Sequence, residues 1–167
     1  MRLRKLECKD AVRMLEWMHD PFVVEKLQTN FYEKTLDDCI SFINNSQNHE
    51  NIHLAIVDDN ELYMGTASLK HITDTGAEFA ITVHKDAMGK GYSIWAMKEI
   101  LRIGFEEYKV KKIYWCVAMD NIRAVRFYDK NNFSRINSQQ IYNVACGYTD
   151  EQIKSYIWYQ VSTEHEK

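Results

Sequence analysis

The sequence predicts a single α/β (α+β) domain in which helices pack on one mixed sheet. The chain has 167 residues, 46% of them hydrophobic and 27% charged, which is the size and composition of one globular domain. Segments with helical spacing of apolar residues alternate with β-branched runs, in the order β-α-α-β-β-β-α-β-α-β-β. We therefore expect one domain over residues 1–167, with about seven strands and about four helices.

The first third of the chain predicts one strand followed by two helices. "RLRKLE", which begins at Arg2, places leucines between basic residues, as in a short strand. "KDAVRMLEWMHD" has helical spacing and should end at Pro21, because proline cannot continue the hydrogen-bond pattern of a helix. In "TLDDCISFINNSQ", Thr35 is the expected N-cap and Asp38 its partner in a capping box.

The middle of the chain predicts three strands and a long helix. "IHLAIVDD" and "NELYMGTASLKHI" are apolar runs on either side of a turn and predict an antiparallel hairpin. "GAEFAITVHKD" predicts a further strand. The helix that follows carries Ile94, Met97 and Leu101 at three- and four-residue steps, which indicates a buried face.

The last third predicts a strand, a short helix and two final strands. "VKKIYWCVA" is expected to be a buried strand, and "MDNIRAVRFYDKNNF" a helix capped by Asp120 or Asn121. Asn132 should adopt the left-handed conformation at the end of that helix. "SRINSQQIYNV" and "IKSYIWYQVS" predict two strands joined by a polar loop. The aromatic last strand offers an edge for pairing, so we expect a monomer or a homodimer.

Composition excludes several classes of protein. Lys and Arg number 21 and Asp and Glu 24, a net charge of −3 with no dense basic patch, so no nucleic-acid partner is expected. No secretory segment and no run of about 18 apolar residues is visible, which favours a cytoplasmic protein without a membrane partner. The four cysteines lack metal-ligand spacing and are expected to be reduced thiols, with no metal bound: Cys8, Cys39, Cys116 and Cys146.

The segment "MGKGYS", from Met88 to Ser93, leads from a strand into the long helix. Its backbone N–H groups and the helix dipole would suit a phosphate, and two glycines would allow close approach. A structural turn without a ligand is an equal alternative. The Walker A pattern is absent, and Ile94 stands where a Rossmann fingerprint needs its third glycine, so ATP and NAD are poor candidates.

A second motif, thirty residues further on, decides between these alternatives. Together the two motifs resemble the GNAT superfamily of acetyl-CoA-dependent N-acetyltransferases. The GNAT pyrophosphate loop, [RQ]-x-x-G-x-[GA], is matched at Gly91 but not at Met88, and Ser93 is the small last residue. The segment "GKGY", which follows the strand "AEFAITV", resembles the corresponding segment in the branch of ribosomal-protein N-terminal acetyltransferases. The later element N-x-x-[AS]-x-x-x-Y-x-K-x-G-F is matched except that Asn132 replaces the glycine; its matching residues are Asn121, Ala124, Tyr128, Lys130 and Phe133.

This resemblance implies a GNAT fold, with a mostly antiparallel sheet that splays in the middle, and acetyl-CoA as co-substrate. The strand residues Ile81, Thr82 and Val83 would pair with the pantetheine arm. The expected contacts with the rest of the cofactor are Met88, Gly89, Lys90, Gly91, Tyr92, Ser93, Asn121 and Lys130. Asn121 has helix capping as an equal alternative, and Lys130 is as well explained as a solvated surface charge.

The resemblance also implies direct attack of an amine on the thioester. Tyr128 is the candidate general acid, because a phenol near pKa 10 keeps its proton at neutral pH. Glu78 is the candidate general base, through water, with an ordinary edge carboxylate as the alternative. His84 could take that role but is better interpreted as a loop histidine.

The acceptor is expected to be a small-molecule or peptide amine, bound near "QTNFYEKT". Phe31 and Tyr32 would line that site, or would fasten the helix to the sheet. Protein N-termini, nucleotide-linked amino sugars and small amines remain open as acceptors. A non-catalytic module that binds acyl-CoA is the alternative function.

Overall fold

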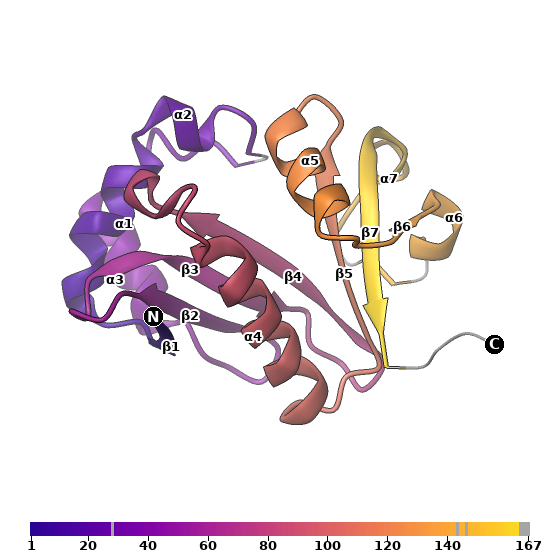
Figure 1. The fold of residues 1–167 in the computed structure, drawn as a ribbon, viewed down its shortest axis with the longest axis horizontal. Coiled ribbons are helices and arrows are strands. Elements are labelled where there is room, and N and C mark those ends of the chain that lie inside the picture. The colour runs from indigo at the N-terminus through magenta and orange to yellow at the C-terminus, as the bar shows by residue number, and fades with distance from the viewer. Residues whose placement is uncertain (28, 143, 146, 164–167) are drawn as a thin grey trace.

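The protein is a seven-stranded sheet flanked by helices on both faces (Figure 1). The computed structural model describes residues 1–27, 29–142, 144–145 and 147–163. The strand order is β1-β2-β3-β4-β5-β7-β6, and every neighbouring pair is antiparallel except β4 and β5. The strands are β1 (Arg2–Lys5), β2 (Ile52–Val57), β3 (Tyr63–Lys70), β4 (Gly76–Val83), β5 (Lys112–Ala118), β6 (Arg135–Ile136) and β7 (Tyr156–Ser162).

The helices of the described residues outnumber those expected from the sequence. About four were predicted; seven α-helices and two 3-10 turns occur in the described ranges. They are η1 (Cys8–Asp10), α1 (Ala11–Met18), α2 (Pro21–Val24), α3 (Leu36–Asn44), η2 (Lys85–Ala87), α4 (Tyr92–Glu106), α5 (Ile122–Lys130), α6 (Ser138–Ile141) and α7 (Asp150–Ser155). The unexpected α2, α6 and α7 have four to six residues, too few to show a helical period.

The predicted helix ends are mostly confirmed. Thr35 and Asp38 form the expected capping box of α3. Pro21 stands at the first position of α2, so it interrupts the first helix as expected. Asn132 has a φ of +60°, the left-handed conformation predicted for the end of α5.

The predicted strand over residues 134–144 is wrong. Only Arg135 and Ile136 pair with β7. Asn137 then caps α6, because its side chain accepts a hydrogen bond from the backbone N–H of Gln140. Ile136 therefore belongs to the short strand β6, whereas Ile141, which is fully buried, belongs to a helical turn rather than to the sheet.

The sheet opens between β4 and β5, as the resemblance implied. The two strands pair in parallel only from Gly76 opposite Lys112 to Glu78 opposite Tyr114. β4 continues to Val83 and β5 to Ala118, and Figure 1 shows the two strands diverging beyond their short pairing. The facing backbone edges beyond Glu78 are consequently available to a third, extended chain.

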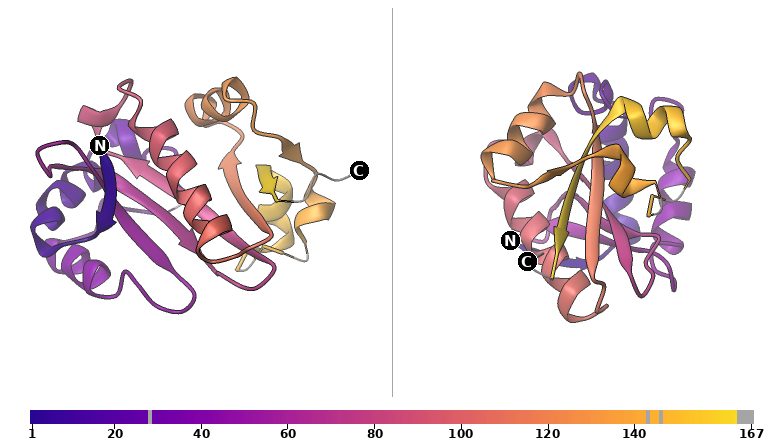
Figure 2. Two further views of the ribbon diagram at one scale, coloured as in Figure 1. Left: turned by 60° about the horizontal axis from the view of Figure 1, so that its bottom comes forward. Right: turned by 90° about the vertical axis from the view of Figure 1, so that its right-hand side faces the viewer.

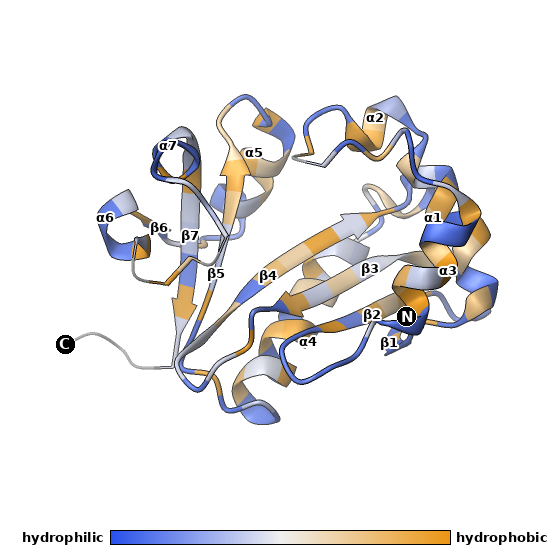
Figure 3. Ribbon diagram, turned by 180° about the vertical axis from the view of Figure 1, so that it is seen from behind, coloured by the Kyte–Doolittle hydropathy of each residue, from blue (hydrophilic) through white to orange (hydrophobic). Residues whose placement is uncertain are grey.

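Different helices cover the two faces of this divided sheet. α4 packs on one face, where Met97 and Ile100 meet Phe79 and Trp115 in the largest core cluster (Figure 2). On the other face, α1 and α3 cover the half built from β1 to β3. Seen from that side in Figure 3, α6 and α7 lie beside β5 and β7 instead. Between these two groups the second face stays open at the splay.

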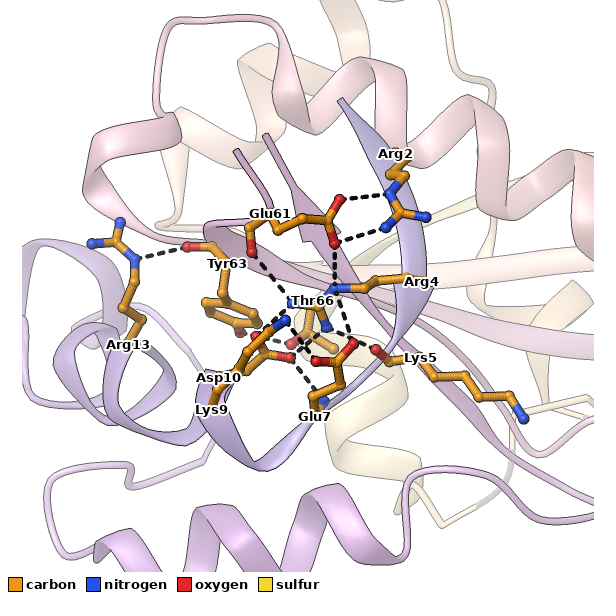
Figure 4. A network of polar contacts seen from close by, with 10 residues as sticks. All are labelled: Arg2, Arg4, Lys5, Glu7, Lys9, Asp10, Arg13, Glu61, Tyr63 and Thr66. Atoms are coloured by element: carbon orange, nitrogen blue, oxygen red, sulfur yellow. Dashed lines mark hydrogen bonds and ion pairs between the residues drawn. The ribbon is translucent and has the colours of Figure 1, made fainter. Parts of the chain in front are cut away.

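The first strand is tied to the core by a network of charges (Figure 4). The Arg4 guanidinium donates to both carboxylate oxygens of Asp10, at 2.7 and 2.8 Å, and Asp10 is 1% exposed. Glu61, from the turn between β2 and β3, lies 3.3 Å from the Arg4 Nε and also accepts from Arg2. A bidentate pair of this kind fixes geometry as well as charge. The network therefore sets the position of β1 and η1 against the hairpin.

Candidate active site

Three adjoining cavities meet where β4 separates from β5, and Ile81 and Thr82 line all of them. The first, of about 270 Å³, lies in the splay itself and reaches Glu78, Cys116 and Tyr128. The second extends from there to Met88, Gly89 and Ser93 at the start of α4. The third, of about 530 Å³, lies under α1 and α3. The cavities thus connect the two faces of the sheet through the opening in its middle.

The loop before α4 leaves several backbone amides open. The N–H groups of Met88 and Lys90 donate to nearby carbonyls, whereas in the described chain those of Gly89, Gly91, Tyr92 and Ser93 have no acceptor. Gly89 and Gly91 have φ values of +73° and +83°, which glycine adopts without strain. A Cβ at either position would touch nothing within 4 Å, so packing does not require these glycines. The loop has the free donors and the clearance that a diphosphate needs.

The cofactor-side residues expected from sequence fall into two groups. Ile81, Thr82 and Val83 line the second cavity, and their strand pairs with β3 on one edge only. Lys90 and Lys130 are exposed and line none of the three cavities. The positions of the three strand residues are therefore compatible with the expected cofactor contact, whereas the two lysines lie outside the cavities.

Tyr128 stands on the boundary between the first and second cavities. Its ring is 7% exposed and packs against Trp115, Phe133 and Tyr159, with centroids 5.1 to 6.1 Å apart. Burial raises the pKa of the Tyr128 phenol above its ordinary value, and Tyr159 and Cys116 add to the shift. The hydroxyl is therefore protonated at neutral pH.

Asn121 caps α5 and also lines two of the cavities. Its side-chain oxygen accepts a hydrogen bond from the backbone N–H of Ala124 at 3.2 Å, which caps α5. The same residue lines the first and second cavities. Since the carbonyl oxygen is used by the helix, the amide NH₂ is the group left for a ligand.

Glu78 is a buried carboxylate on the opposite face of the sheet from Tyr128. It is 4% exposed and lines the first cavity, the one in the splay, which is called the central cavity below. Its Oε1 accepts from Lys70 Nζ at 2.9 Å and from the Tyr148 hydroxyl at 2.8 Å. Its Oε2 is buried without a hydrogen-bond partner among the described residues. The edge-carboxylate alternative therefore does not describe its position.

The third cavity has an aromatic wall and a hydroxyl-rich floor. Phe31 packs edge-on against Trp17 at 5.0 Å and lines both the first and third cavities. Tyr32 is 51% exposed and lines none of the three. The remaining polar lining is Thr29, Lys34, Asp38, Ser41, His53, Thr66, Ser68 and Lys70. The segment expected to bind the acceptor thus contributes Phe31 but not Tyr32 to a cavity.

His84 is buried rather than exposed in a loop. Its Nδ1 accepts from the backbone N–H of Asp86 at 3.2 Å, which caps η2, so its Nε2 carries the proton and donates to Glu16 at 3.0 Å. It is 2% exposed and lines none of the three cavities. This histidine supports the loop before α4 and does not face the site.

Sequence reasoning did not find Lys70, Tyr148 or Arg123. Lys70 lies opposite Glu78 in the register of β3 and β4, a pairing that the hairpin and strand predictions could have supplied. Tyr148 comes from the loop between α6 and α7 and reaches Glu78 across 70 residues. Arg123 lines the second cavity and lies over the Phe22 ring. No local pattern marks the last two.

The thiols are distributed unevenly. Cys39 is fully buried, as expected, whereas Cys8 is exposed. Cys116 is half-buried and lines the central cavity. Cys146 lies outside the described residues.

The chain matches known acetyltransferases in sequence and in fold. A family profile described as "Acetyltransferase (GNAT) domain" matches residues 1–134. Acetyltransferase PseH of Campylobacter jejuni (serotype O:2) is 23% identical over 142 residues, which are 85% of this chain and 88% of that relative.

Solved structures extend the match to nearly the whole chain. The spermidine N-acetyltransferase of Vibrio cholerae in complex with CoA and spermine is 18% identical, with a TM-score of 0.76 over 96% of this chain and 94% of that one. The N-acetyltransferase PseH of Campylobacter jejuni is also 18% identical, with a TM-score of 0.66 over 98% of both chains.

The divided sheet, the open amide loop and the family match define one class of protein. The chain belongs to the GNAT superfamily and is an N-acetyltransferase. The narrower likeness to the ribosomal-protein branch is not tested by these matches. Among the residues that the structure describes, no helix has the length and apolarity to cross a bilayer, and no three metal-ligating side chains cluster.

Proposed function

We propose that the protein transfers an acetyl group from acetyl-CoA to a small amine by direct attack of the amine on the thioester. One observation carries the proposal: Tyr128 and Glu78 lie on opposite faces of the sheet and line the same cavity in its opening. A reaction that must give a proton to a leaving thiolate on one side and take one from an amine on the other needs this arrangement.

The second cavity suits the cofactor. The open amides of the loop before α4 would hold its diphosphate, and the unpaired edge of β4 from Ile81 to Val83 would receive its extended arm. When bound, acetyl-CoA supplies the activated acetyl group. The chain's part is to hold the thioester in the splay, where an amine from the other face can reach it; such positioning contributes several kcal/mol, on the order of 7 or more in favourable cases.

Two side chains would handle the protons. The Tyr128 hydroxyl keeps its proton at neutral pH and would donate it toward the leaving sulfur. The Glu78 carboxylate has one oxygen without a partner, which would accept an N–H of the amine directly or through water. In the described residues the cavity thus offers an acid and a base without requiring an enzyme-bound acyl group.

The lining of the third cavity favours an acceptor with hydroxyl or anionic groups. Lys34 lines it, as does Lys70, which is paired with Glu78; the only carboxylate among its described lining residues, Asp38, is committed to the cap of α3. A polyamine carries several positive charges and needs several carboxylates in return. Of the acceptor classes open from sequence, a nucleotide-linked amino sugar is therefore favoured over a polyamine such as spermidine.

Thiol release from acetyl-CoA tests the proposal. The wild type should acetylate a nucleotide-linked amino sugar faster than spermidine or a tetrapeptide with a free N-terminus. Tyr128→Phe should lower kcat by roughly a hundredfold while acetyl-CoA still binds, because only the proton donor is removed. Phe127→Leu, at the neighbouring position in the second cavity, is the matched control for packing. Tight binding of acetyl-CoA without release on any amine would instead favour a non-catalytic binding module.

A further inference from the structure

We infer that Tyr148 is a positioning residue for the acceptor amine: with Lys70 it holds one oxygen of Glu78 and leaves the other, Oε2, to meet the amine. The inference rests on the proposed function, because it takes an amine as the acceptor. Tyr148 lies beyond residues 1–134, the part of the chain that the family profile matches. The contact therefore involves the C-terminal segment, outside the residues that the family profile matches.

The Tyr148 ring is clamped so that its hydroxyl points at Glu78. The ring packs edge-on against Trp158 at 5.1 Å and Tyr156 at 6.3 Å, within the cluster that α6 and α7 form on β5 and β7. Burial, together with Cys116 and Glu78, raises the pKa of the Tyr148 phenol. It is therefore a neutral hydroxyl that donates to Glu78 Oε1 at 2.8 Å.

Lys70 supplies the second donor to the same oxygen. Its Nζ lies 2.9 Å from Oε1, and the two residues face each other across β3 and β4. Two donors from different halves of the molecule converge on one oxygen and fix the plane of the carboxylate. A carboxylate held by one donor could rotate about its last torsion, which has a broad minimum.

The other oxygen is left for a ligand. Oε2 is buried and has no hydrogen-bond donor among the described residues; the His71 Nε2 lies 3.7 Å away, beyond hydrogen-bond distance. A buried carboxylate oxygen without a donor is unfavourable, and a bound N–H would satisfy it. Since Glu78, Lys70 and Tyr148 all line the central cavity, the geometry points to the acceptor amine as that donor.

Steady-state kinetics of Tyr148→Phe test this role. The variant keeps the ring and its packing and removes only the donor. We expect kcat/KM for the best amine of the panel above to fall about tenfold or more, with KM for acetyl-CoA changed by less than about twofold. Tyr156→Phe removes a hydroxyl from the same aromatic cluster without touching Glu78, and it should behave as the wild type. The inference would be overturned if kcat/KM fell equally for the amine and for acetyl-CoA, or if it did not fall for the amine.

Crystals soaked with ethylamine separate this inference from the proposed function, because they require no turnover. In the wild type the amine nitrogen should lie within hydrogen-bond distance of Glu78 Oε2. In Tyr148→Phe the carboxylate should turn and the amine density should be lost. Ethylamine bound elsewhere, or bound equally in both proteins, would contradict the role of Tyr148 even if acetylation is observed. If no amine is acetylated but this density is found, the proposed function fails and the positioning of the carboxylate stands.

Discussion

Asp10 and Glu78 are both buried carboxylates beside a cation, but they are satisfied to different degrees. Asp10 Oδ1 and Oδ2 each accept from Arg4, and Oδ2 also accepts from the backbone N–H of Glu7. At Glu78, Oε1 accepts twice and Oε2 has no partner among the described residues. The two side chains are 1% and 5% exposed, so burial alone does not distinguish them.

The difference teaches how to separate a structural charge from a functional one. Arginine is a planar fork that can occupy both oxygens of a carboxylate, whereas lysine is a point charge that reaches one. Both oxygens of Asp10 are therefore occupied, and the Arg4–Asp10 pair holds β1 and η1 together (Figure 4). The Lys70–Glu78 pair leaves Oε2 without a hydrogen-bond donor among the described residues. Three variants test this distinction.

Asp10→Asn should have the largest effect, and on stability. It leaves Arg4, whose side chain is 8% exposed, without its bidentate partner, so the free energy of unfolding should fall by about 4 kcal/mol. Urea unfolding measures the change. Asp59→Asn is the control, since that carboxylate is 92% exposed, and it should leave unfolding unchanged. A loss of activity per folded molecule in Asp10→Asn would show that the first network also serves the site.

Glu78→Gln should affect the rate rather than the fold. The amide oxygen can still accept from Lys70 and Tyr148, but the proton acceptor is gone, so amine acetylation should slow by roughly a hundred- to a thousandfold. Unfolding free energy should change by about 1 kcal/mol at most, because the Lys70 side chain is 31% exposed and stays hydrated when its partner is neutral. Glu99→Gln, on the exposed side of α4, is the matched control. An unchanged rate would remove the functional half of the comparison.

His53 extends the comparison to a half-buried base that lines the third cavity, and its effect should be the smallest. Its Nδ1 lies 2.7 Å from the Ser68 hydroxyl, and burial, with a smaller effect of Lys70, lowers its pKa to about 4. Below its ordinary pKa of about 6.5 the unfolded chain binds a proton that the folded protein refuses until near pH 4, so acid favours unfolding in that window.

The expected size follows from that window. Between pH 7 and pH 4.5 this group should cost about 2 kcal/mol of stability, and the cost should be absent in His53→Gln. Urea unfolding at both pH values measures the difference between the two proteins. Equal pH dependence in wild type and variant would show that the folded protein accepts a proton at His53 near neutral pH.

The comparison also marks where sequence reasoning succeeded. The Thr35 cap, the left-handed Asn132 and the hairpin of β2 and β3 depend on residues close in the chain, and all were predicted. The stretch from 134 to 155 was not, because four- to six-residue helices capped by Asn137 and Thr149 show no period of their own.

The site divides in the same way. Tyr128, Asn121 and the glycine loop belong to motifs, so the sequence indicated them. Glu78 was indicated by its place on a strand, but its hydrogen bonds were not. Lys70 comes from the neighbouring strand, and Tyr148 comes from a loop 70 residues away. Tyr32 was expected beside Phe31 in the acceptor site, and only Phe31 reaches a cavity.

The sequence by itself determined the family, the strand number and the elements that carry Tyr128 on α5 and the open amides before α4, because each depends on spacing within one segment. The tertiary structure alone decided which carboxylate is closed by its partners and which is left open. Hydrogen-bond satisfaction is a sum over donors from several elements, and only the folded chain brings those donors to one atom.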